Sequence, residues 1–268
     1  MLAAAEGYFL YIGGGQMRIS QMAIAAAAAA VTALLCTCAR AQWLTYPTPG
    51  IPRTPDGKAN LSAPAPRGVN GGPDLSGIWE AKTANPTNSG AASLQPWADA
   101  IDKQRRQTFN LKDDPAARCL PMGPPRSDRR GPHKIVQFPE LIVILYEEST
   151  LYRQIFLDGR ELPKEPNPTW MGYSVGHWDG DTLVVDTAGF NDQVWIWSGH
   201  PHTEALRTIE RFRRRDFGHM ELQVAFNDPK TYTMPWTLLF DLQLVPDTEL
   251  LESICNENNT NRPHLVGK

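Results

Sequence analysis

The residues best suited to chemistry in this sequence are a glutamate inside a strand pattern and a histidine just before that pattern. Alternation in the run 206–215 puts Leu206, Thr208, Glu210 and Phe212 on one face. Burial raises the pKa of a carboxyl group, so Glu210 could act as a general acid or base. His202 titrates near neutral pH and could be its proton-transfer partner. The alternative is a structural ion pair between Glu210 and an arginine such as Arg153.

Motifs for metals and cofactors are largely missing from the sequence. His200 and His202, two residues apart, could ligate a metal, but Glu204 is too close and Glu210 too far away for a cupin-like ligand set. The chain has no G-x-S-x-G motif, no P-loop and no G-x-G-x-x-G between a strand and a helix. The sequence therefore predicts neither a metal nor a cofactor.

Aromatic residues are unusually dense in the second half of the chain. Tryptophan and tyrosine side chains supply large contact areas with one polar atom each, and such clusters line pockets for flat or apolar ligands. They also fill barrels without binding anything. The run 195–197 predicts two indoles on one face of a strand. As ligand-binding candidates we take Arg153, Trp170, Trp195, Trp197, Tyr232 and Trp236.

The elements that would position these side chains are short strands joined by tight turns. The clearest hairpin is 173–190, where Asp179-Gly180 predicts a type I′ turn. Strand candidates that follow this pattern lie at 74–80, 135–138, 141–147, 151–157, 173–178, 182–187, 206–215, 219–226, 236–245 and 249–255. A short helix is expected at 96–109. The fold class predicted is all-β with minor α, an antiparallel meander that closes into a barrel, with a β-sandwich as the alternative.

The first 73 residues predict a targeting signal followed by a linker. Met17-Arg18, the apolar run 23–38 and the small-residue pattern at 39–41 predict a signal peptide over residues 1–41, in which 1–16 are a start-site extension. A retained transmembrane anchor is the alternative. The Pro-rich stretch 42–73 predicts a tether or a strap over the domain, and 74–268 a single β domain. We therefore expect a periplasmic or secreted bacterial protein with no stable membrane span after cleavage.

The cysteines and the net charge agree with a periplasmic or secreted location. Removal of the signal leaves Cys119 and Cys255, which in an oxidising compartment predict one disulfide; a reactive thiol is the alternative. The formal net charge of −3, with no basic stripe, argues against a nucleic-acid partner.

Two resemblances add to these expectations. The segments 54–58, 74–79 (D-L-S-G-I-W), 178–185 and 210–211 resemble an uncharacterised family of secreted bacterial proteins common in acidobacteria. That resemblance implies secretion and assigns no active site. Gly77-x-Trp79 entering the first strand, the meander and a disulfide to the chain end are similar to lipocalins. The helix before most of the strands departs from the lipocalin pattern.

Three functions are compatible with these features. The first is an exported barrel that binds a small apolar or aromatic ligand. The second is a periplasmic, cofactor-free acid/base enzyme (a lyase, isomerase or hydrolase) with Glu210 and His202 as its catalytic pair. The third is a structural role in the cell envelope, which would leave the aromatic cluster unexplained.

Overall fold

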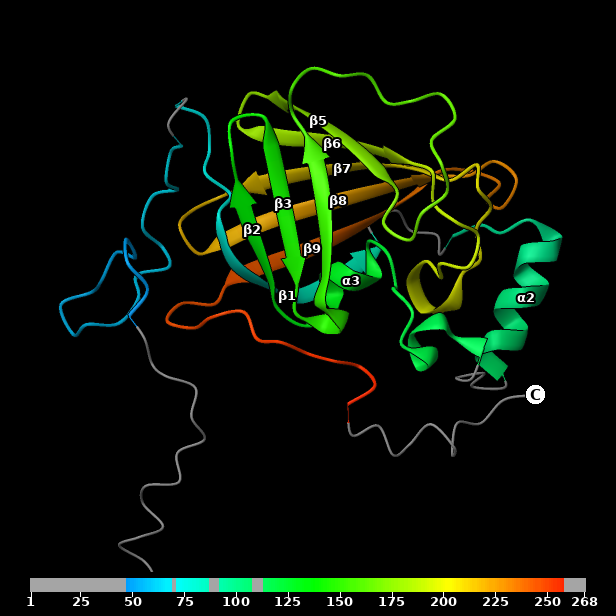
Figure 1. Ribbon diagram of the computed structural model, residues 1–268, viewed down its shortest axis with the longest axis horizontal. Coiled ribbons are helices and arrows are strands. Elements are labelled where there is room, and N and C mark those ends of the chain that lie inside the picture. Colours follow the sequence, from blue (N-terminus) through cyan, green and yellow to red (C-terminus); the bar gives the residue numbers. More distant parts are fainter. Residues whose placement is uncertain (1–46, 69–70, 87–91, 108–112, 258–268) are drawn as a thin grey trace, which may run out of the picture. The chain divides into compact units, whose positions relative to one another are not determined.

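The computed structural model describes residues 47–68, 71–86, 92–107 and 113–257. Their central feature is a closed barrel of nine strands in sequence order, in which the first strand pairs with the last (Figure 1). The strands are β1 (Gly77–Pro86), β2 (His133–Gln137), β3 (Leu141–Tyr146), β4 (Leu151–Phe156), β5 (Tyr173–Asp179), β6 (Thr182–Ala188), β7 (Arg207–Arg214), β8 (His219–Asn227) and β9 (Trp236–Leu244). The predicted fold class is confirmed, and closure pairs the edges that a sandwich would leave open.

One junction departs from the predicted meander. The β4–β5 pair is parallel, with Ile155 opposite Ser174, whereas the other eight neighbouring pairs are antiparallel. A parallel pair needs a crossover connection rather than a tight turn. The long segment 157–172 supplies that connection.

The barrel core follows the alternation of the sequence. Along β8 and β9 every second side chain is buried and the intervening ones are half-buried or exposed. On β7 the same period buries Thr208, Glu210, Phe212 and Arg214, while the residues between them are exposed. The interior is therefore mostly apolar, with polar side chains entering it from β7.

The 173–190 hairpin forms as expected, but with a different turn. Asp179 pairs with Thr182, so the two central residues are Gly180 and Asp181 rather than Asp179 and Gly180. Of these two, only Gly180 has a positive φ, +58°. A positive φ at the first central residue alone is the pattern of a type II′ turn, so the type I′ prediction was wrong.

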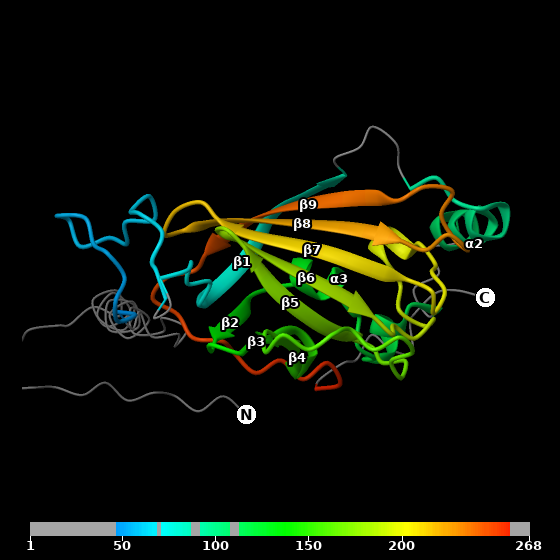
Figure 2. The ribbon, with the colours of Figure 1, turned by 90° about the horizontal axis from the view of Figure 1, so that it is seen from above.

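The two ends of the barrel are covered by different parts of the chain (Figures 1 and 2). Residues 47–68 and 71–76, which we call the strap, hydrogen-bond to the turns at one end: the amide of Gly218 donates to the carbonyl of Leu61 (2.7 Å), and that of Leu75 to Gln137 (2.9 Å). The opposite end carries α2 (Pro96–Gln107) and the single-turn helix α3 (Arg126–Arg129). We call it the helical end.

The prediction of a strand at 249–255 was wrong, because these residues form no strand and lie in an irregular segment. That segment still ends in the predicted disulfide, in which the Cα atoms of Cys119 and Cys255 are 5.5 Å apart. The bridge fixes the segment before α3 to the chain that follows β9.

Several expectations concern residues outside the described ranges. These are the signal peptide and its cleavage site within residues 1–41, and the end of the predicted helix at 108–109. Within the described ranges, no helix is long and apolar enough to cross a membrane.

Candidate functional site

A buried ion pair lies at the centre of the polar interior. Arg153 of β4 and Glu210 of β7 are 2 % and 0 % exposed. The guanidinium binds both carboxylate oxygens of Glu210, with an Nη1–Oε1 distance of 2.9 Å, and two hydroxyl groups complete the contact: Ser174 accepts from Nε (3.1 Å) and Thr187 from Nη2 (2.8 Å). The structure thus brings together two residues singled out from sequence, in the arrangement of a structural pair.

The cost of burying Arg153 is offset by its partner. Burial by itself disfavours the charged guanidinium, but the adjacent carboxylate of Glu210 outweighs burial and raises the pKa of Arg153. Removing one member of such a pair leaves an uncompensated buried charge, at a cost of roughly 3–5 kcal/mol. The pair therefore fixes β4 against β7 inside the barrel.

A second carboxyl group enters this interior from α3. Asp128 is 1 % exposed, and its Oδ1 accepts a hydrogen bond of 2.8 Å from the hydroxyl of Tyr146, at the end of β3. Burial, and next the negative charge of Glu210, raise the pKa of Asp128 to about 7. Burial and the Asp128 carboxylate likewise raise the pKa of Tyr146, which stays a neutral donor. Asp128 is therefore poised between its neutral and its charged form near neutral pH.

Six buried polar side-chain atoms lack a hydrogen-bond partner within the described part of the chain. Two of them are Nε2 of His202 and Nε1 of Trp236. The other four, at the helical end, are Oγ of Ser127, Oδ2 of Asp128, Nδ1 of His133 and Oγ1 of Thr208, on side chains that are at most 2 % exposed. A buried polar group without a partner costs about 1–3 kcal/mol, so natural proteins supply a partner, from water or from a ligand.

His133 adds a neutral group to this end of the barrel. It opens β2 opposite Tyr146, with the two ring centroids 5.8 Å apart. Burial lowers the pKa of its imidazole to about 4, so the ring is uncharged at neutral pH. We call Ser127, Asp128, His133, Tyr146, Arg153, Ser174, Thr187, Thr208 and Glu210 the interior polar cluster.

Each of the two loop histidines has a hydrogen-bond partner at Nδ1, whereas the buried Nε2 of His202 has none among the described residues. The Nδ1 of His202 lies 2.8 Å from the carbonyl of Thr203, and its ring meets Phe190 edge-on. Burial lowers its pKa, and the carboxylates that act on it are Asp228 and Asp192 rather than Glu210. His200 instead bonds Asp102 of α2 through Nδ1 (2.8 Å). The catalytic role of Glu210 and His202 stays a prediction to which this geometry adds no contact.

The described ranges contain no cluster of side chains suited to metal binding. No group of three or more His, Cys, Asp or Glu side chains there is arranged to hold an ion.

The aromatic candidates gather at the helical end, but not on one strand. The run 195–197 leads into a 3₁₀ turn, so the prediction of two indoles on a strand face was wrong. Trp195 stacks under Arg105 of α2, 3.9 Å from ring centroid to guanidinium carbon, whereas Trp197 lies against Arg129 of α3 (4.5 Å) and edge-on to Phe240. The two indole rings thus pack against different helices, Trp195 against α2 and Trp197 against α3.

The remaining aromatic candidates pack close by. Trp236 stacks on Phe226 with a centroid distance of 4.4 Å, and Tyr232 meets Trp236 edge-on. The Tyr232 hydroxyl donates to the carbonyl of Pro201 (2.9 Å). Trp170 is half-buried against the core.

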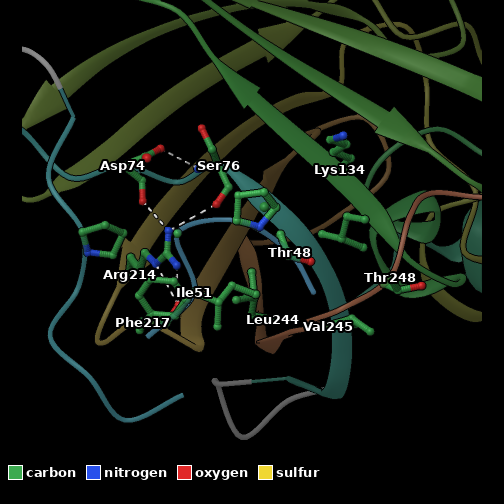
Figure 3. A pocket seen from close by; sticks show the side chains of 15 residues that line it. Thr48, Ile51, Asp74, Ser76, Lys134, Arg214, Phe217, Leu244, Val245 and Thr248 are labelled. Atoms are coloured by element: carbon green, nitrogen blue, oxygen red, sulfur yellow. Dashed lines mark hydrogen bonds between the residues drawn. The ribbon is translucent and has the colours of Figure 1, made fainter. Parts of the chain in front are cut away.

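A hollow of about 350 Å³ lies at the strap end (Figure 3). Two cationic residues, Lys134 and Arg214, line it. Arg214 points at main-chain carbonyls: Nη1 donates to Asp74 (2.6 Å) and Ser76 (3.3 Å), and the guanidinium lies 4.8 Å from the Trp79 ring. Burial lowers the pKa of Arg214 to about 10, so it stays charged at neutral pH. Because its donors already hold the strap onto the barrel, we assign Arg214 to structure.

Sequence reasoning placed Thr208 on the same strand face as Glu210, but it missed Asp128, His133 and Arg214 as buried polar residues. For Arg214 the period of two that pointed to Glu210 was available, because both residues share one face of β7. Asp128 lies on a single helical turn in a Pro-rich segment, where no periodicity shows which face is buried.

The closed nine-strand barrel is consistent with the calycin- and lipocalin-like class of β-barrels. Among solved structures, the chain is similar to a mutant of the fluorescent protein UnaG, at 12 % identity and a TM-score of 0.31, over 64 % of this chain and 96 % of that chain. A similarity this low supports no shared function. No family model matches the chain. No curated protein matches it either.

Proposed function

We propose that this protein is an exported barrel that binds a small molecule with an aromatic or apolar body in the helical end of its interior. The observation that carries the proposal is the set of buried polar atoms without partners in the interior polar cluster, among the residues described. A ligand with a polar head would supply those partners, and the apolar core and nearby aromatic rings would receive its body.

Export is supported by the disulfide between Cys119 and Cys255. Such bridges persist in oxidising compartments and are rare in the cytosol. This agrees with the periplasmic or secreted location expected from the N-terminal residues.

The test is calorimetric titration with a neutral aromatic probe, 2-naphthylmethanol. We expect saturable binding at one site per chain. Thr208→Val should weaken it roughly two- to tenfold, because one net hydrogen bond contributes about 0.5–1.5 kcal/mol. The matched control is Thr83→Val on β1, whose exposed side chain faces away from the interior and should leave the affinity unchanged.

Two results would count against ligand binding in the barrel interior. One is the absence of saturable binding by 2-naphthylmethanol. The other is equal affinity in the wild type and the Thr208→Val variant, which would place the probe elsewhere on the protein.

A further inference from the structure

The charges of the interior polar cluster restrict what its ligand can carry. Arg153 is the one cation in this cluster, it acts electrostatically on Asp128, and its guanidinium donors go to Glu210, Ser174 and Thr187. An anionic ligand would have to displace Glu210 from that contact and leave a second carboxylate buried without its partner. The site is therefore closed to a carboxylate head.

Asp128 supplies the charge that remains. Arg153 and Glu210 neutralise each other, and His133 and Tyr146 are uncharged at neutral pH. When Asp128 ionises, the cluster carries a net charge of −1, which sits on a carboxylate with one oxygen unpartnered among the described residues. A buried carboxylate in this state is best stabilised by a cation that also donates a hydrogen bond.

We infer that the ligand is an aromatic or apolar amine whose protonated nitrogen donates to Oδ2 of Asp128. The inference rests on the proposed function and goes further by naming the head group. Ser127 and His133 offer further polar atoms for the remaining N–H groups. Nearby tryptophans such as Trp197 already stack against a cation, Arg129, so the helical end also accommodates positive charge next to aromatic rings.

The groups that face Asp128 decide how this binding depends on pH. They are Tyr146 on β3, Arg153 on β4 and Glu210 on β7, and His133 on β2 lies next to Tyr146 as a neutral ring. Since burial and Glu210 raise the pKa of Asp128 to about 7, its carboxyl group is partly protonated at neutral pH. Amine binding must then release a proton at pH 7 and become weaker as the pH falls toward 5.

The test compares three probes that share one ring system: 2-naphthylmethylamine, 2-naphthylmethanol and 2-naphthoic acid. At pH 8, titration calorimetry with the wild-type protein should show the amine binding at least tenfold more tightly than the acid. Asp128→Asn should remove most of this preference, because the amide keeps the acceptor for Tyr146 but has no charge.

A second measurement needs no variant. Titration of the wild type with the amine at pH 7, in two buffers of different ionisation enthalpy, should reveal proton release, which the alcohol should not cause. The inference is overturned if the acid binds as tightly as the amine, or if amine binding releases no proton. The proposed function would survive both results, whereas failure of all three probes to bind would overturn the proposed function as well.

Discussion

Thr187 and Thr208 face each other across β6 and β7, yet their hydroxyl groups are in different situations. Thr187 accepts a hydrogen bond of 2.8 Å from Arg153, whereas Thr208 has no partner within the described residues. Both side chains are buried. This pair separates a hydroxyl group that stabilises the buried ion pair from one that has no partner among the described residues.

We expect valine at these two positions to affect the free energy of unfolding differently. Thr187→Val should lower the free energy of unfolding by about 1–3 kcal/mol, because it leaves an Arg153 N–H without that acceptor. Thr208→Val should leave stability unchanged or raise it, since it removes a buried hydroxyl that has no partner among the described residues. Urea denaturation of both variants checks this. A loss in Thr208→Val equal to that in Thr187→Val would mean that this hydroxyl has a structural partner.

Asp128 predicts a pH dependence of stability. Its pKa is raised to about 7 in the folded protein, from an ordinary value near 3.8, so the folded state binds the extra proton between these limits. Stability from this group is therefore greatest below about pH 4 and falls as the pH rises to 7. Asp128→Asn cannot ionise, so it should gain roughly 2–4 kcal/mol relative to wild type between pH 4.5 and pH 8.

Urea denaturation of both proteins at pH 4.5 and pH 8 measures that relative gain. Burial of His133 has the opposite effect on stability in the same range, but it acts on both proteins and cancels in the comparison. A difference between the two proteins that does not change with pH would show that Asp128 titrates normally.

At the scale of elements, the alternation of apolar residues predicted most strands and the buried face of β7. It placed Glu210 correctly because a strand repeats every two residues whatever surrounds it. The parallel β4–β5 pair could not be predicted this way, since it depends on the path of segment 157–172. The position of Asp128 likewise depends on how the segment before β2 folds across the barrel end.

The strap makes a close backbone contact that can be tested. A Cβ atom on Gly218, in the β7–β8 turn, would lie 2.4 Å from Cβ and 3.0 Å from Cα of Leu61. Gly218→Ala should therefore push the strap off this turn, lower the melting temperature and speed limited proteolysis within the strap. Gly72→Ala is the matched control, because a Cβ there meets nothing within 4 Å. Equal proteolysis of both variants would contradict the described docking of the strap.

At the scale of the whole barrel, the two ends differ in whether their buried polar groups have hydrogen-bond partners. At the strap end, Arg214 donates to the main-chain carbonyls of Asp74 in the strap and Phe217 in the β7–β8 turn (Figure 3). The helical end contains the polar atoms without partners in the described ranges, the neutral His133 and the titrating Asp128. This difference is what supports the proposal that a ligand binds at the second end rather than at the first.

The most direct test of this assignment is a crystal structure of the protein grown with 2-naphthylmethylamine at pH 8. Our account predicts electron density for the naphthyl ring inside the barrel at the helical end, with the amine nitrogen about 2.7–2.9 Å from Oδ2 of Asp128. Density for ordered waters alone at Ser127, Asp128, His133 and Thr208, with the amine absent or bound only in the strap-end hollow, would contradict it.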